Sequence, residues 1–174
     1  MLRRICVVSH DELWPGQFAA ESTALAAAFG GRATEIHHVG STSVPGLPAK
    51  PIIDILVVID DIEQVDSLNP AMIALGYEPQ GEYGIPGRRF FTKGGDVNRS
   101  HHVHVFQLGH PEVSAMLGFR DYLRSHPRQA IEYGRLKEEL ALMCEDDVIA
   151  YNAGKDAFVK DLIRKARAWR QETR

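Results

Sequence analysis

The chain has 174 residues, of which 44% are hydrophobic and 25% charged, and its formal net charge is −3. These are the values of an ordinary globular protein that is long enough to bury a core. The charge gives no general attraction to nucleic acid or to an anionic membrane, and no apolar stretch approaches the length that spans a bilayer.

The cysteines and the N-terminus indicate the compartment. Cys6 and Cys144 stand far apart without metal-type spacing, and two unpaired thiols fit a reducing environment. The apolar run at residues 5–8, which predicts a short edge strand or a tail, is too short for a signal peptide. We therefore expect a soluble cytoplasmic protein with neither a membrane nor nucleic acid as its partner. The sequence does not give the oligomeric state.

The first 110 residues mix helical and strand patterns. Apolar residues at helical spacing predict helices over residues 17–29 and 62–75, and Asn69-Pro70 is a point where the second one breaks or restarts. Strands are predicted from β-branched and alternating runs at residues 35–39, 52–59, 89–93 and 102–108. The first two of these strands are joined by an irregular turn rich in small residues.

After residue 110 the pattern is helical throughout. Three helices are predicted, at residues 112–124, 127–144 and 148–169. In the middle helix, Ile131, Leu136 and Leu140 are expected to face inward. The linker near residue 110 is too short to be flexible, so we expect a single domain over residues 1–174, with a mixed α/β core at 1–110 and a helical part at 111–174.

One acid interrupts the most apolar run of the chain. Residues 52–59 are Ile, Leu and Val apart from Asp54, which is typical of a strand buried on both faces. Burying a carboxylate is costly unless a partner compensates it. Asp54 is therefore expected either to bind a metal or act as a general base, or to be a structural acid paired with Lys50, Arg88 or a backbone N–H.

The turn before this strand is a run of small residues, Gly40-Ser41-Thr42-Ser43. Such a turn exposes backbone N–H groups, and its hydroxyls add donors, so it is a candidate cradle for phosphate. It lacks the Gly-Lys-Ser/Thr ending of a P-loop. The alternative is an ordinary Gly/Ser turn.

Two histidines of a later strand, His102 and His104, are two residues apart and so point to one face. With Asp54 they would form a site with two nitrogen ligands and one oxygen ligand for a metal. The alternative is that one imidazole makes a hydrogen bond in the core and the other is solvated.

Positive charge for an anionic substrate is expected from Lys50, Arg88 and Lys155, although at least one of the neighbours Arg88 and Arg89 is expected to be an ordinary surface residue. Tyr151 and Lys155 are i, i+4 neighbours on the inward stripe of the last predicted helix. Lys155 there indicates either a buried partner such as a ligand phosphate or a side chain that reaches solvent at the edge of the core.

These motifs resemble the GrpB-like family, also called UPF0157. The resemblance rests on residues 39–47 (VGSTSVPGL) and 49–55 (AKPIIDI), and shorter matches follow in the family's order: Trp14-Pro15, residues 102–105, residues 119–124, Tyr133, Leu136-Lys137, Tyr151 and Lys155. It implies the fold of the nucleotidyltransferase superfamily, an α/β (α+β) protein with a mixed β-sheet flanked by helices and a C-terminal helical bundle. It also implies that Gly40 and Ser41 contact nucleotide phosphate and that Asp54 is the first metal-binding carboxylate.

The sequence departs from the superfamily at the second carboxylate, because Leu56 stands two residues after Asp54. Transfer through two metals needs several acids. We expect a protein that binds a nucleotide or other phosphorylated small molecule, with a divalent metal (Mg²⁺, Mn²⁺ or Zn²⁺) at Asp54, His102 and His104. If it is catalytic, it would perform metal-assisted nucleotidyl or phosphoryl transfer through Asp54. The alternatives are a catalytically degenerate binding module and a single-metal hydrolase.

Overall fold

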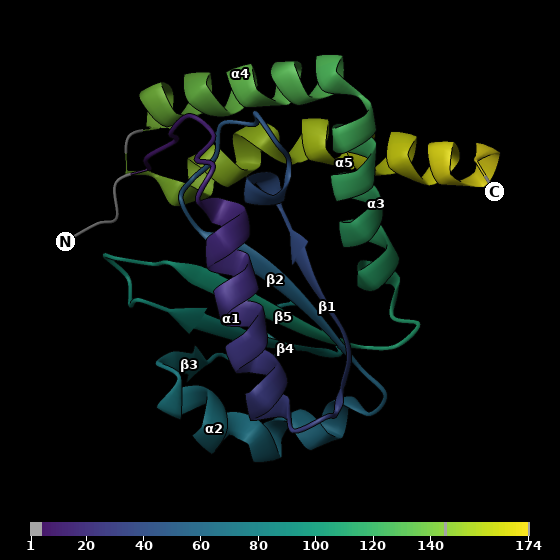
Figure 1. Ribbon diagram of the computed structural model, residues 1–174. Coiled ribbons are helices and arrows are strands. Elements are labelled where there is room, and N and C mark those ends of the chain that lie inside the picture. The colour runs from purple at the N-terminus through teal and green to yellow at the C-terminus, as the bar shows by residue number, and fades with distance from the viewer. Residues whose placement is uncertain (1–4, 145, 174) are drawn as a thin grey trace.

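The computed structural model describes residues 5–144 and 146–173 and contains one five-stranded mixed sheet (Figure 1). The strands are β1 (Ala33–Val39), β2 (Ile53–Ile59), β3 (Tyr77–Pro79), β4 (Arg88–Lys93) and β5 (His101–Gln107). Their order in the sheet is β1-β2-β5-β4-β3. The β2–β5 pair is parallel, and the other neighbouring pairs are antiparallel.

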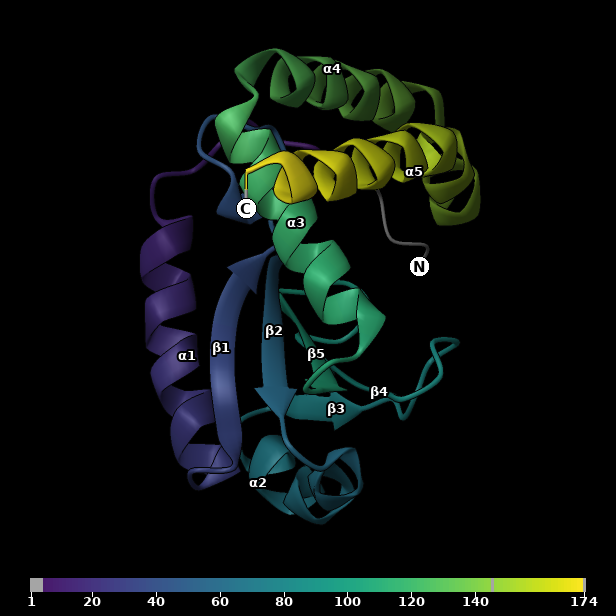
Figure 2. The same ribbon diagram turned by 90° about the vertical axis from the view of Figure 1, so that its right-hand side faces the viewer.

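Helices cover both faces and one end of this sheet. They are α1 (Trp14–Phe29), α2 (Asn69–Ala74), α3 (Pro111–Ser125), α4 (Pro127–Cys144) and α5 (Val148–Glu172). Figure 2 shows α1 and α3 on opposite sides of β2, with α4 and α5 across the end of the sheet. The expected mixed sheet flanked by helices and followed by a helical part is therefore confirmed.

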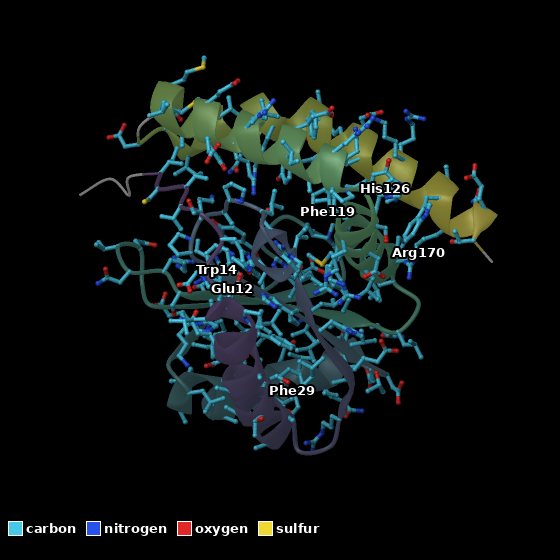
Figure 3. All side chains as sticks on the ribbon, turned by 45° about the horizontal axis from the view of Figure 1, so that its top comes forward. Glu12, Trp14, Phe29, Phe119, His126 and Arg170 are labelled. Carbon is cyan, nitrogen blue, oxygen red and sulfur yellow. The ribbon has the colours of Figure 1, made fainter. Side chains whose placement is uncertain are left out.

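The two faces of the sheet pack against different helices. On one face, β2 and β5 pack against α1, whose Trp14 and Phe29 are buried near its two ends (Figure 3). On the other face, Leu56 and Val58 pack against α3. A third cluster joins α3, α4 and α5 to Val44 in the loop between β1 and β2. That loop is therefore held between the sheet and the helical part.

Local chemistry explains where the elements begin and end. Helix α1 ends at Gly30, which has a left-handed φ of 57° that glycine adopts without a Cβ penalty. Pro127 opens α4, where its missing N–H has no helical partner to lose. The Asp147 side chain accepts a hydrogen bond from the Ala150 N–H and caps α5.

Some expectations about local structure were incomplete or wrong. Residues 62–75 do not form one α-helix: a 3₁₀ helix over Ile62–Leu68 precedes α2, which restarts at Asn69-Pro70. Short strands were expected between residues 77 and 95, but the position of β3 was not predicted. Residues 5–8 contribute a single bridge, between Val8 and Ala49. Ile131 is 55% exposed, so its predicted inward position was wrong.

Among the described residues no helix is both long and apolar enough to cross a membrane. Cys6 and Cys144 are free cysteines. The predicted domain of residues 1–174 includes residues 1–4, 145 and 174, which lie outside the described part of the chain.

Candidate functional site

Three side chains converge where β2 and β5 begin. The parallel pairing of these strands sets Asp54 opposite His102 and Leu56 opposite His104. Asp54 Oδ1 lies 3.0 Å from His102 Nδ1 and 3.5 Å from His104 Nε2. One potential ligand atom from each of Asp54, His102 and His104 lies within 4.8 Å of the others. The structure thus brings together the three residues that the sequence proposed as a metal site.

Their surroundings set the charge of these groups. Burial opposes ionisation of Asp54, but hydrogen bonds and charge interactions with His102 and His104 hold the pKa of its carboxyl well below the usual range. Burial lowers the pKa of the His104 imidazole, and the Asp54 carboxylate offsets only part of this effect. Near neutral pH the site therefore presents an ionised carboxylate beside a neutral His104, the forms that bind metals.

Arg88 approaches the other nitrogen of His104. The buried Arg88 donates to the carbonyl oxygens of Glu82 and Tyr83 at 3.1 and 2.6 Å, and its Nη1 lies 3.4 Å from His104 Nδ1. A guanidinium only donates, so His104 Nδ1 accepts and the ring proton lies on Nε2, toward Asp54. Arg88 therefore holds His104 in position, whereas the sequence predicted that Arg88 would face an anionic ligand directly.

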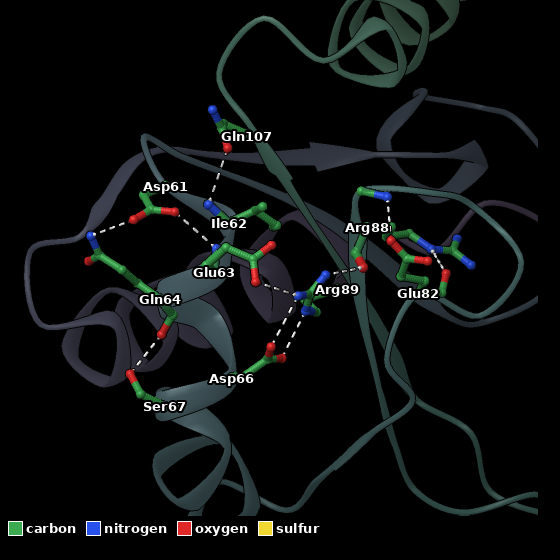
Figure 4. Close-up of polar contacts among 11 residues, drawn as sticks. Asp61, Ile62, Glu63, Gln64, Asp66, Ser67, Glu82, Arg88, Arg89 and Gln107 are labelled. Carbon is green, nitrogen blue, oxygen red and sulfur yellow. Dashed lines mark hydrogen bonds and ion pairs between the residues drawn. The ribbon is translucent and has the colours of Figure 1, made fainter.

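The neighbouring Arg89 points to the opposite face of β4. Its guanidinium donates two hydrogen bonds to Asp66, at 2.8 and 3.0 Å (Figure 4). The Arg89 side chain is only 13% exposed and pairs with Asp66, and Arg88 is buried, so neither arginine is the ordinary surface residue that was expected of this pair.

Gly40 brings the turn against Asp54. Its φ of 71° and ψ of −172° fall in a region that is essentially restricted to glycine. A Cβ at this position would lie 2.6 Å from Asp54 Oδ2, closer than real contacts allow. Glycine is therefore needed both for the backbone conformation and for the close approach of the Asp54 carboxylate.

The hydroxyls of the turn divide into two groups. The buried Ser43 hydroxyl donates to the Gly40 carbonyl at 2.6 Å, and the buried Thr42 hydroxyl bonds His38 Nε2 at 2.9 Å. These two side chains hold the shape of the turn. Ser41 lines the cavity above Asp54 together with Tyr133 of α4. Of the predicted phosphate-binding hydroxyls, Ser41 is thus the one that faces both the cavity and the helical part.

A small cavity of about 280 Å³ adjoins the carboxylate and is strongly basic; we call it the lysine cavity. Its lining includes Asp54 and His102 together with the residues Ser41, Thr42, Lys50, Tyr133, Lys137, Tyr151, Asn152 and Lys155. Lys50 Nζ and Lys155 Nζ lie 5.0 and 5.2 Å from the centre of the Tyr151 ring. The tyrosine thus holds two cations over the cavity by cation–π contacts.

Lys137 is the charged residue of this cavity that was not predicted as a site residue; Tyr133 and Asn152 were not predicted either. Its side chain is almost fully buried, donates to the Pro48 carbonyl and lies over the Tyr133 ring at 4.6 Å. A signal existed, because Tyr133, Lys137 and Leu140 share one face of α4 at helical spacing. The same helical-spacing argument places Lys155 on the inward face of α5.

Burial and neighbouring positive charges shift the pKa values of the lysines in this cavity. Burial, with further repulsion from Lys155 and Lys50, lowers the pKa of Lys137 to about 7. Burial also lowers the pKa of Lys155, although the Asp54 carboxylate opposes this shift. Burial raises the pKa of the Tyr151 phenol to about 12. An anion in the cavity would stabilise the charged lysines, so the site is suited to phosphate.

The residues present fit one metal ion and not two. Two imidazoles and one carboxylate match zinc chemistry better than magnesium, which prefers oxygen ligands. Leu56 is fully buried in an apolar cluster, so β2 supplies no second carboxylate. Binding through His104 Nε2 would require the ring proton to move to Nδ1 and Arg88 to release that nitrogen.

Comparison with known proteins identifies relatives of this chain. It is 43% identical to UPF0157 protein YqkA of Bacillus subtilis over 169 residues, which are 97% of this chain and 49% of YqkA. The chain thus spans about half the length of that relative. The crystal structure of conserved protein GrpB from Enterococcus faecalis superposes with a TM-score of 0.90 at 41% identity, covering 94% of this chain and 99% of the other.

A more distant structure shares the fold. Cid1, a poly(U) polymerase solved in complex with its short product ApU, superposes with a TM-score of 0.53 at 15% identity, over 75% of this chain and 42% of Cid1. At this identity the likeness shows a nucleotidyltransferase-like fold and nothing more. The sequence profile of the family described as GrpB protein matches residues 4–165. The chain therefore belongs to the GrpB family.

Proposed function

We propose that this chain binds a nucleotide or another phosphorylated small molecule where β1, β2 and β5 meet. The observation that carries the proposal is the gathering of Lys50, Lys137 and Lys155 in one cavity with Asp54. Cations beside a small polar cavity favour phosphate. Ser41, Lys50, Lys137, Tyr151 and Lys155 would contact the ligand, and Gly40, Thr42 and Ser43 would shape the turn beside it. Arg88 would hold His104 in the site without metal.

The reaction that this site supports best is metal-assisted nucleotidyl or phosphoryl transfer. Asp54, His102 and His104 would hold the ion, with Asp54 as the central catalytic residue. A bound divalent ion would polarise a phosphate oxygen. The lysines would stabilise charge that develops on the phosphate, and the Gly40 turn would hold the Asp54 carboxylate in place. The nucleotidyltransferase-like fold supports a nucleotide as the ligand.

The test is a thermal-shift screen of nucleoside triphosphates with and without Mg²⁺, Mn²⁺ and Zn²⁺. A ligand at about 100 times its Kd adds about 2.7 kcal/mol, which raises the Tm by about 5–10 °C for a chain of this size. We expect a nucleotide-dependent shift that a metal increases and that Asp54→Asn removes. Asp60→Asn, the same change at an exposed residue just after β2, is the matched control.

The possible results separate the candidates. A shift with zinc alone, together with phosphoesterase activity that needs no ATP, would favour a single-metal hydrolase. Unchanged ligand and metal affinity in Asp54→Asn would contradict the site assignment. No shift with any phosphorylated ligand would contradict the proposed function as a whole.

A second candidate function is a binding module without catalysis. The fully buried Leu56 favours it, because the face of β2 that carries Asp54 holds no other acid. This candidate predicts nucleotide affinity that EDTA does not alter, and no turnover of the bound nucleotide.

A further inference from the structure

Asp54 lies at the junction of two cavities with different chemistry. Beside the lysine cavity is a second one of about 480 Å³, which we call the apolar cavity. The two share Asp54 and four further lining residues, Ser41, Tyr133, Asn152 and Lys155. A single ligand can therefore reach from one cavity to the other past the Asp54 carboxylate.

The apolar cavity lies between the sheet, α3 and α5. Apolar side chains of three elements line it: Val39 of β1, Ala115, Met116 and Phe119 of α3, and Val159 and Ile163 of α5. Figure 3 shows Phe119 on α3, on the side where the helical part meets the sheet. The thioether of Met116 and the ring of Phe119 are side chains that accommodate a flat aromatic group.

Charge decides which part of a ligand each cavity accepts. Among the described residues that line the apolar cavity, Lys155 at the shared border is the only Lys or Arg. Its two acids beyond Asp54 are Glu112 and Asp156, and Asp156 is already paired with Lys160 at 2.7 Å. Glu112 forms no close ion pair with any residue that the structure describes, and the Arg88 guanidinium interacts with its charge at longer range. The Glu112 carboxylate would repel a phosphate and would accept hydrogen bonds from an amino or ring N–H group.

We propose that the apolar cavity binds the nucleoside part of the ligand, so that the substrate is a nucleoside polyphosphate that crosses Asp54. This inference rests on the proposed function, since it takes phosphate binding in the lysine cavity as given. The sizes agree, because small-molecule sites span about 300–1,000 Å³. The lysine cavity alone, at about 280 Å³, suits phosphate groups and leaves the base to its larger neighbour.

The test compares nucleotides with inorganic tripolyphosphate, which has no nucleoside. Titration calorimetry would measure binding of tripolyphosphate, ATP, GTP, CTP and UTP to the wild-type chain and to Ala115→Leu, which fills the apolar cavity. In the wild type, at least one nucleotide should bind ten times more tightly than tripolyphosphate. In Ala115→Leu this advantage should fall below threefold, while tripolyphosphate affinity stays within twofold.

Controls separate occupancy of the cavity from damage to the fold. Ala168→Leu makes the same change on an exposed position of α5 outside both cavities, and should leave every affinity within twofold. Val159→Phe fills the apolar cavity from α5 and replaces Ala115→Leu if that variant does not fold. Lys50→Met should weaken tripolyphosphate and nucleotides by similar factors.

The outcomes distinguish this inference from the proposed function. If tripolyphosphate binds but no nucleotide binds more tightly, or if filling the cavity leaves the nucleotide advantage intact, the nucleoside assignment is overturned and phosphate binding stands. If neither tripolyphosphate nor any nucleotide binds to the wild type, the proposed function fails, and this inference fails with it.

Discussion

The two faces of β2 differ in that one packs only into the core and the other carries the central residue of the candidate site. Ile53, Ile55 and Val57 point into the continuous apolar cluster beneath α1. On the opposite face of β2, Leu56 and Val58 are equally buried, but Asp54 at the start of the strand faces the two cavities. The two faces differ in polarity only at the amino end of β2, where β1 ends and β5 begins.

The location of the site is unusual for a parallel pair of strands. Ligands of open α/β sheets bind outside the carboxyl ends of the strands. Here Asp54 and His102 lie at the amino ends of β2 and β5. The antiparallel neighbour β1 ends beside them and delivers the Gly40 turn to Asp54. The mixed sheet therefore creates a site at the end that a purely parallel sheet leaves unused.

The largest effect on stability should come from truncating the apolar face. Ile55 is fully buried, so Ile55→Ala should lower the free energy of unfolding by ~2–5 kcal/mol, the usual cost of a cavity in a core. Urea unfolding would measure this loss. Ile73→Ala, at a position of α2 that is 58% exposed, should cost less than ~0.5 kcal/mol.

In the fraction that stays folded, Ile55→Ala should leave nucleotide affinity within threefold of wild type. A larger loss of affinity would contradict the independence of the two faces, because it would show that packing under α1 controls the position of Asp54.

The apolar face contains a buried histidine, His38, whose titration can be followed. His38 pairs with Ile55 in register, stacks on Phe18 at 4.9 Å and is hydrogen-bonded to Thr42. Burial lowers the pKa of His38 to about 4 from an ordinary value of 6.5. Below pH 6.5 the unfolded chain binds the proton first, so stability should fall as pH drops from 6.5 to 4, by about 3 kcal/mol in total.

The measurement is the free energy of unfolding at pH 7 and pH 4 in wild type and in His38→Gln, which cannot titrate. The difference between the two pH values should be about 3 kcal/mol smaller in the variant. His37→Gln changes the neighbouring histidine, whose ring pairs with Glu35 at 2.6 Å. If His38→Gln and His37→Gln change the acid sensitivity equally, His38 is not held neutral by burial.

The face of β2 that carries Asp54 can be disturbed without changing its charged residues. Gly40→Ala introduces a Cβ 2.6 Å from the Asp54 carboxylate at a φ of 71°, which should cost ~1–3 kcal/mol of stability. Since the carboxylate must move, zinc affinity should fall by about tenfold or more, as when a supporting group of a metal site is lost. Differential scanning calorimetry and zinc titration would measure the two effects.

Gly46→Ala is the matched control. Gly46 also has a positive φ, of 75°, but a Cβ there meets nothing within 4 Å. Its substitution should lower stability without changing zinc affinity. If both variants lose zinc affinity equally, backbone strain in the loop is responsible, and the contact with Asp54 has no special part.

Regular elements could be predicted because their signals are local. Pro127 marks the start of α4, and the helix runs Pro127–Cys144 as the periodicity predicted. Alternation within one strand was sufficient to place His102 and His104 on one face. The three residues of β3 are too few for an alternating pattern, so the position of this strand could not be predicted.

Long-range contacts determine the side-chain positions that could not be predicted from the sequence. Lys137 enters the lysine cavity because it donates to the carbonyl of Pro48, 89 positions earlier. The sequence predicted Arg88 as a source of positive charge for a substrate, but its guanidinium is held by the carbonyl oxygens of Glu82 and Tyr83 beside His104. The inward position predicted for Ile131 was wrong because Tyr133, Lys137 and Leu140 form the buried face of α4, and Ile131 lies outside that face.

The smallest effect should come from the outer edge of the apolar face, where Arg89 pairs with Asp66. This contact has two short hydrogen bonds, yet the Asp66 side chain is 56% exposed. Water and salt screen such pairs, so Asp66→Asn should cost less than ~1 kcal/mol. Half-molar salt should shrink the difference, and nucleotide affinity should stay within twofold. A loss as large as that of Ile55→Ala would mean that the 3₁₀ helix carrying Asp66 is held to β4 by this ion pair instead of by its buried residues Val65 and Leu68.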